Sequence, residues 1–94
     1  MRLLVLYHPY SEQASAVDSF NHDLQARYNS SAELVSVDTR GGAEVAEMYD
    51  ITSYPAVIAT DYEGKLLNIW QGESLPLIND IAYYLQDSFS SHSL

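Results

Sequence analysis

Cysteine is absent from this chain of 94 residues. Thiol–disulfide exchange requires a thiolate nucleophile and a second thiol that resolves the mixed disulfide, so this chemistry is excluded. A disulfide framework is excluded too, and a small domain must then be held together by its apolar core. The absence of cysteine is typical of a reducing compartment, and we expect a cytoplasmic protein.

Positive charge is scarce as well. Four Lys and Arg residues stand against thirteen Asp and Glu residues, which gives a formal net charge of −9. Each contact with a phosphate requires a cation, so we expect neither nucleic acid nor an anionic membrane as a partner. The acidic residues are dispersed along the chain, which indicates a solvated surface; an acidic docking face is the alternative.

No apolar run reaches the roughly 20 residues that a membrane-spanning helix needs. The apolar start of the chain stops at His8 and Pro9, and no small-residue cleavage site follows. This start therefore predicts a buried strand rather than a signal peptide.

The chain does contain a regular alternation of strand and helix patterns. Continuous or alternating apolar residues predict strands, apolar residues at helical spacing predict helices, and residues 61–65 form a hairpin turn signal. Strands are expected at residues 3–7, 33–38, 56–60 and 66–71, and helices at 12–28, 43–49 and 74–86. Ser11 offers an N-cap for the first helix, and residues 39–42 are expected to form a loop.

This order, βαβαββα, predicts an α/β domain with a four-stranded mixed sheet. The helical crossover implies parallel pairing of the first two strands, and the short turn implies antiparallel pairing of the last two. Helices should cover both faces of the sheet. One domain is expected over residues 1–87, followed by a flexible, serine-rich tail at residues 88–94.

Three local features together resemble the thioredoxin-like superfamily. The chain opens with a strand, a loop and a helix; Tyr54-Pro55 precedes the third strand, where the family has a cis-proline; and Gly72 follows the hairpin, where the family has a glycine. The resemblance spans residues 2 to about 86 and implies the minimal thioredoxin core. It places Ser11 and Ala14 at the positions of the family's two redox cysteines.

The chain departs from the family at the positions that redox chemistry needs. Ser11 is an alcohol without disulfide chemistry, and Ala14 offers no reactive group. The buried carboxylate of the family's first strand falls by register at Val5 or an apolar neighbour. The resemblance therefore implies a redox-inactive, cysteine-free member, which we expect to be no enzyme and to use no cofactor.

A binding role does not need cysteine. In the family, the backbone just before the cis-proline pairs with an extended peptide or with glutathione by strand addition. The resemblance thus implies a candidate binding groove at this place. Its residues are His8, Pro9, Tyr10, Ser11, Tyr54 and Pro55. The alternative is that Pro55 is kept only as a structural turn.

Histidine raises the question of other chemistry. His8 is a candidate general base for the Ser11 hydroxyl, but no orienting acid is evident near it in the sequence. The alternative is that Ser11 caps the helix while His8 packs or points to water. His22 and His92 are distant along the chain, so no metal site is expected.

Aromatic residues are consistent with an interface. Trp70 lies on the fourth strand, which should be a sheet edge, and an exposed edge invites pairing with another chain. We therefore expect the chain to bind a protein or a peptide, or a second copy of itself as a homodimer. The alternative is that Trp70 covers a helix–sheet seam within the monomer.

Two further interpretations stay open. The first is a resemblance to the glutathione-binding domain of glutathione transferases, which has a Tyr or Ser at the same helix start and a Glu-Ser pair opening its last helix. Tyr7, Ser11 and the pair Glu73-Ser74 match this pattern, although the hairpin is longer than usual. The second interpretation is a structural subunit of a larger assembly.

Overall fold

β1 (Arg2–Tyr7) lies inside the sheet, with β2 (Glu33–Ser36) on one side and β3 (Ala56–Thr60) on the other. β4 (Leu66–Gln71) pairs with β3 and forms the far edge. β1 is parallel to β2 and antiparallel to β3, and β3 is antiparallel to β4. The predicted mixed sheet is therefore confirmed, with the order β2-β1-β3-β4.

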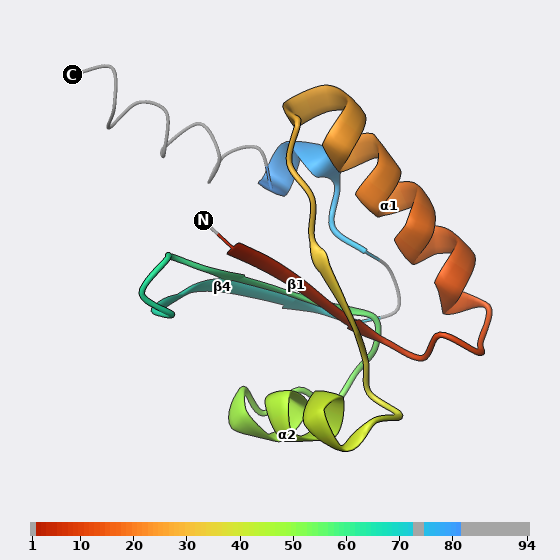
Figure 1. Cartoon of the computed structure of the whole chain (residues 1–94), viewed down its shortest axis with the longest axis vertical. Helices are drawn as coiled ribbons and strands as arrows, with labels where there is room; N and C mark the ends of the chain where they lie inside the picture. Colours follow the sequence, from red (N-terminus) through yellow and green to blue (C-terminus); the bar gives the residue numbers. More distant parts are fainter. Residues whose placement is uncertain (1, 73–74, 82–94) are drawn as a thin grey trace.

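Helices cover both faces of this sheet, as predicted (Figure 1). The computed structural model describes residues 2–72 and 75–81. α1 (Gln13–Tyr28) lies on one face together with a helical turn at residues 78–81, and α2 (Arg40–Met48) lies on the opposite face.

The core consists of two apolar clusters, one on each face, because successive strand residues point to opposite sides of a sheet. The α1 face buries Leu3, Val5, Val17, Phe20, Leu24, Ala32, Val57, Ala59 and Ile81. The α2 face buries Leu6, Ala46, Ile51, Ala56 and Ile58. Every residue of β3 is buried, as expected for a strand that is covered on both sides. β3 thus joins the two halves of the core.

The start of α2 differs from the prediction. The sequence predicts a loop at residues 39–42, whereas the helix already begins at Arg40 with Thr39 as its N-cap. The Thr39 hydroxyl accepts a hydrogen bond from the Gly42 N–H at 3.0 Å and donates one to the Ser36 carbonyl at 2.8 Å. A Cβ at Gly42 would collide with that same carbonyl, so glycine marks a close approach here rather than a turn.

β2 and α1 are each shorter than predicted. β2 ends at Ser36 rather than residue 38, because the Ser36 hydroxyl accepts from the Asp38 N–H and the chain turns. α1 begins at Gln13, and its N-cap position is Glu12 rather than Ser11. β3 and β4 match the predicted bounds.

Several predictions fall outside the described part of the chain. The last helix, predicted at residues 74–86, is seen at residues 78–81. Residues 75–77 are described and are not helical, because Pro76 lacks an N–H and disfavours helical backbone in the residue before it. Residues 82–86 lie outside, as do the Glu73-Ser74 pair, His92 and the predicted tail at 88–94. Within residues 2–72 and 75–81, no helix combines the length and the apolar character needed to cross a membrane.

Candidate functional site

The candidate groove lies at one end of the sheet. β1 and β2 are parallel, so their carboxyl ends lie side by side, and the antiparallel β3 begins at the same end. Figure 1 shows the loop after β1 and the segment between β2 and α2 meeting there. This topology brings residues 8–14, residue 38 and residues 51–55 together although they are far apart in the sequence.

His8 and Tyr54 form the aromatic part of the site. Their rings meet edge to face, with centroids 5.2 Å apart and planes at 79°. The Tyr54–Pro55 peptide bond is cis, and Pro55 is buried at the start of β3. The Tyr54 hydroxyl donates to the Ile51 carbonyl at 3.4 Å, so this side chain is held by its hydroxyl as well as by the contact of its ring with His8. The structure thus brings these three predicted residues together.

Ser11 and Tyr10 have different surroundings. The Ser11 hydroxyl donates to the His8 carbonyl at 2.6 Å and accepts from the Gln13 N–H at 3.2 Å, so it supports the first turn of α1. Its single proton is therefore used by backbone and is not directed at the His8 ring. The Tyr10 side chain is 97% exposed, whereas Pro9 and Ala14 are half-buried.

An acid that the sequence interpretation missed lies against His8. The Asp38 carboxylate is 3.0 Å from His8 Nδ1, and both side chains are about half exposed. The expectation that no orienting acid lies nearby is therefore wrong. The available signal was topological, because parallel strands place the residues that follow them at the same edge of the sheet. Asp38 fixes the orientation of the imidazole ring.

Gln13 was also missed, and it links the two loops of the site. Its Oε1 atom accepts from the His8 N–H at 3.0 Å, and its Nε2 atom donates to the Tyr54 carbonyl at 3.3 Å. One side-chain amide therefore connects the end of β1 with the residue before Pro55. Nothing in the apolar periodicity of the chain distinguishes this glutamine from any other polar residue at a helix start.

A second glutamine holds the other side of the cis-proline loop. Gln71, the last residue of β4, accepts the N–H groups of Thr52 and Ser53 on Oε1, at 3.1 and 3.3 Å. Glutamine side chains from α1 and β4 thus bind three successive residues of one loop. The backbone of this loop is held from both sides.

The remaining expectations concern metals and the redox chemistry of the family. Among the described residues, no group of three or more His, Cys, Asp or Glu side chains is arranged to hold a metal ion. His22 is exposed on α1, away from His8 along the chain. Val5, at the position of the family's buried carboxylate, is completely buried in the core. Tyr7 packs against the cluster on the α1 face.

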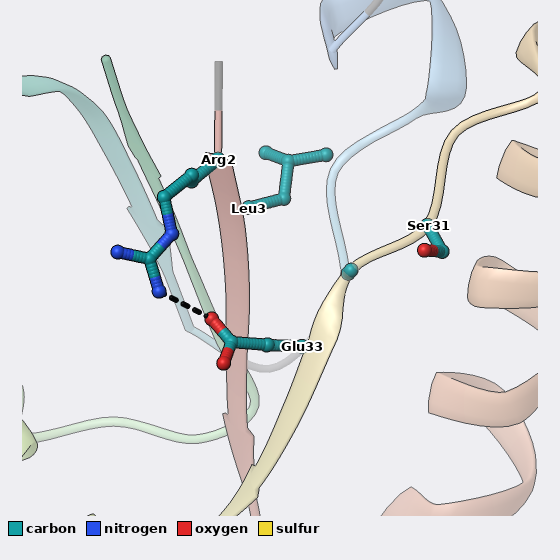
Figure 2. Close-up of a pocket in the computed structure, with 5 residues that line it drawn as sticks. Arg2, Leu3, Ser31 and Glu33 are labelled. Carbon is teal, nitrogen blue, oxygen red and sulfur yellow. Dashed lines mark hydrogen bonds and ion pairs between the residues drawn. The ribbon is translucent and has the colours of Figure 1, made fainter. Parts of the chain in front are cut away.

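A polar pocket lies at the opposite end of β1. It has a volume of about 350 Å³ and is lined by Arg2, Leu3, Ser31, Ala32 and Glu33 (Figure 2). Two of these residues, Arg2 and Glu33, form an ion pair at 2.7 Å, with both side chains at least half exposed. No residue of the candidate groove lines this pocket.

The edge strand β4 carries Trp70, as predicted, and its indole is half-buried against the cluster on the α1 face. This agrees with the alternative in which Trp70 covers a seam inside the monomer. The neighbouring Ile69 N–H donates to the Asn68 side chain at 2.8 Å. A backbone donor on this edge is thus satisfied by the strand's own side chain.

Comparisons with known proteins identify the fold. Thioredoxin 1 from the thermophilic eubacterium Thermosipho africanus TCF52B is similar at a TM-score of 0.72 and 11% identity, over 100% of both chains. A designed protein is similar at a TM-score of 0.64 and 21% identity, over 94% of this chain and 75% of that one. No family model and no curated protein matches the sequence. The fold predicted from the sequence is confirmed.

Proposed function

We propose that this chain, a cysteine-free protein with the thioredoxin-like fold, is a non-catalytic module that binds an extended segment of another protein or of a second copy of itself. The binding site is the groove around the cis Tyr54–Pro55 bond. The observation that carries the proposal is Tyr10, which is 97% exposed on the same loop as His8, whose ring contacts that of Tyr54. Tyrosine buries large area at low entropic cost and is enriched at interfaces.

A purely binding role agrees with the chemistry of the site. The chain has no thiol, and the Ser11 proton is donated to backbone rather than to His8. We therefore propose that the protein uses no cofactor and no metal and catalyses no reaction. From the net charge of −9, we further propose that neither nucleic acid nor a membrane is a partner. From the absence of cysteine, we propose that the protein works in the cytoplasm.

Charge complementarity indicates the kind of segment that would bind. Glu12 and Asp38 are exposed beside Tyr10 and His8, and the protein as a whole is acidic. A segment with Lys or Arg residues would be attracted to this end of the sheet, while an acidic segment would be repelled. Charge therefore favours an extended, cationic segment of another protein over a second copy of this acidic chain, and the segment would cover the Tyr10 ring.

An array of short random-sequence peptides tests the proposal directly. We expect the wild-type protein to retain peptides enriched in Lys and Arg, and Tyr10→Ala to weaken their binding by about tenfold, since buried aromatic side chains dominate interface energies. Tyr62→Ala is the matched control, because Tyr62 is 80% exposed in the turn at the other end of β3. A wild-type protein that retains no peptide, or equal losses in both variants, would contradict binding to another protein and leave self-association as the remaining form of the proposal.

Self-association is tested separately by sedimentation over a range of protein concentrations. If the bound segment belongs to a second copy, wild-type protein and Tyr62→Ala associate as concentration rises, and Tyr10→Ala remains monomeric. A strict monomer that also retains no peptide from the array would rule out both forms of the proposal.

A further inference from the structure

The two edges of the sheet differ in how their backbone groups are satisfied. β2 forms one edge and β4 the other, and no described strand lies beyond either (Figure 1). On β4, the Asn68 side chain accepts from the Ile69 N–H, so a backbone donor is satisfied within the strand. On β2, no side chain of the described residues bonds to the backbone of Leu34, the second of its four residues. The centre of β2 is therefore an unprotected part of the sheet edge.

Leu34 directs both of its backbone groups away from the sheet. The Val37 N–H donates to the Tyr7 carbonyl of β1 at 3.1 Å. Backbone groups face alternate sides along a strand, so Val35 also faces β1, whereas Leu34 and Ser36 face outward. Leu34 thus presents an N–H and a C=O side by side on the outer edge of β2.

Side chains close this outer edge at both ends. The Ala32 N–H donates to Asn21 Oδ1 at 2.8 Å, and the Ser36 carbonyl accepts from the Thr39 hydroxyl at 2.8 Å. The outward groups between these two caps are the Ala32 carbonyl, the Leu34 N–H and C=O, and the Ser36 N–H. They comprise two donors and two acceptors, and their order is symmetric about Leu34.

We propose that the outer edge of β2 binds β2 of a second copy in antiparallel register, with Leu34 of both copies at a two-fold axis. In an antiparallel pair, a residue with both groups facing outward exchanges two hydrogen bonds with the residue directly opposite. About a two-fold axis that residue is Leu34 of the second copy, and each Ser36 N–H then faces the other copy's Ala32 carbonyl. The caps end the ladder at this length. This interface goes beyond the proposed function, because it does not use the groove around the cis-proline.

The side chains of β2 are compatible with this register. Leu34 lies beside Val5 on the α1 face of the sheet and is 37% exposed. The two Leu34 side chains would lie directly opposite each other and bury apolar surface that is exposed in the monomer. Glu33 would lie opposite Val35 of the second copy, so no acid faces an acid across the pair.

Charge opposes the pairing of two copies, but least at this edge. Each copy has a net charge of −9. Glu33 is the one acid in residues 32–36, and its carboxylate is paired with Arg2 at 2.7 Å. The remaining repulsion acts over a longer range and is screened by salt, so we expect the copies to associate more tightly as the salt concentration rises.

Charge exchange at Leu34 tests the register. We expect weak association of the wild type in sedimentation up to about 1 mM protein, because a strand of four residues buries less area than a standard interface. Leu34→Glu and Leu34→Lys should each weaken it by about fivefold, since like charges then face each other. An equimolar mixture of the two variants should restore association. A mixture no better than the separate variants overturns the register.

A control variant and a second measurement complete the experiment. Leu66→Glu makes the same change of charge at a leucine of β4 that is 43% exposed, and it should sediment as the wild type. Amide hydrogen exchange of the wild type requires no variant to fold: exchange at Leu34 and Ser36 should slow as protein concentration rises, while Val35, bonded to β1, does not change. Protection of Leu34 that does not depend on concentration would assign the edge to the chain itself and overturn the inference.

The outcomes separate this inference from the proposed function. Tyr10→Ala should associate as the wild type does, and Leu34→Glu should still retain the array peptides. Added salt should strengthen association and weaken the retention of cationic peptides. A strict monomer with unchanged exchange at Leu34 overturns pairing at β2 even if peptides are retained. Association that is lost in Tyr10→Ala and kept in Leu34→Glu would assign the second copy to the groove instead and also overturn it.

Discussion

Asp38 and His8 are 30 residues apart in the sequence, and Asp38 Oδ1 lies 3.0 Å from His8 Nδ1. The contact exists because β1 and β2 are parallel neighbours, so that the residues following each strand arrive at the same edge. It converts an isolated exposed histidine into an oriented one, next to the loop that contains Tyr54 and Pro55.

Replacement of Asp38 should change the His8 tautomer and leave stability nearly intact. With Asp38 as acceptor, the neutral ring carries its proton on Nδ1, since the hydrogen bond at one nitrogen selects the tautomer. In Asp38→Ala we expect a shift of the ring ¹⁵N signals toward the Nε2–H form, with unfolding free energy changed by less than about 1 kcal/mol. The exposed His22 is the internal control, and unchanged His8 signals would contradict the contact.

The N-cap of α2 should contribute measurably to stability. Thr39→Ala removes the acceptor of the Gly42 N–H and should cost about 1 kcal/mol. Thr52→Ala is a suitable comparison, because Thr52 is exposed and its hydrogen bond to Gln71 comes from the backbone. Denaturant unfolding measures both; a Thr39→Ala midpoint no lower than that of Thr52→Ala would show that the cap is not formed.

The two adjacent glycines of α2 should respond in opposite directions to alanine. Gly42→Ala places a methyl group against the Ser36 carbonyl and should destabilise by about 1 to 3 kcal/mol. A Cβ at Gly41 meets no atom within 4 Å. Gly41→Ala should therefore stabilise the protein by up to about 1 kcal/mol, because alanine lowers the conformational entropy of the unfolded chain. Thermal unfolding of both variants checks this, and a common sign would contradict the described start of α2.

The core on the α1 face should be sensitive to loss of volume. Leu24 is completely buried, so Leu24→Ala should cost about 2 to 5 kcal/mol. Leu77→Ala removes the same atoms from a side chain that is 70% exposed and should change the unfolding free energy by less than about 0.5 kcal/mol. Similar midpoints for the two variants would argue against the packing of α1 on the sheet.

The outer edge of β4 should depend on Asn68 to resist pairing with another chain. Asn68→Ala removes the acceptor of the Ile69 N–H and offers that donor to another chain. We expect the variant to associate at lower protein concentration than the wild type in sedimentation, while Asn79→Ala, an exposed asparagine beyond the sheet, behaves as the wild type. Identical sedimentation of all three proteins would show that Asn68 does not protect the edge.

The fold was predictable because it depends on apolar patterns that lie within single elements. The continuous apolar run of β3 and the hairpin signal that follows it predicted both strands to the residue. The start of α2 was mispredicted, because a pair of glycines looks like a turn unless the nearby Ser36 carbonyl is known. The local sequence pattern does not indicate which atoms from other segments lie next to a residue.

The site was predictable only in part, for the same reason. His8, Tyr54 and Pro55 were brought together by a family resemblance that already included their topology. Asp38 and Gln13 were not, since their roles depend on side-chain contacts between segments that the sequence keeps apart. A polar residue at a loop or a helix start has no periodic signal that would distinguish it from its exposed neighbours.

The hydrogen bonds of Gln13 and Gln71 to the cis-proline loop affect how the protein responds to pH and salt. Carboxamides do not titrate and carry no net charge, so neither acidity nor ionic strength weakens these contacts directly, unlike the exposed Arg2–Glu33 pair. By contrast, the attraction between the net charge of −9 and a cationic partner is screened as the salt concentration rises. Added salt would therefore lower the association rate of a cationic partner, but it would not change the conformation of the cis-proline loop to which the partner binds.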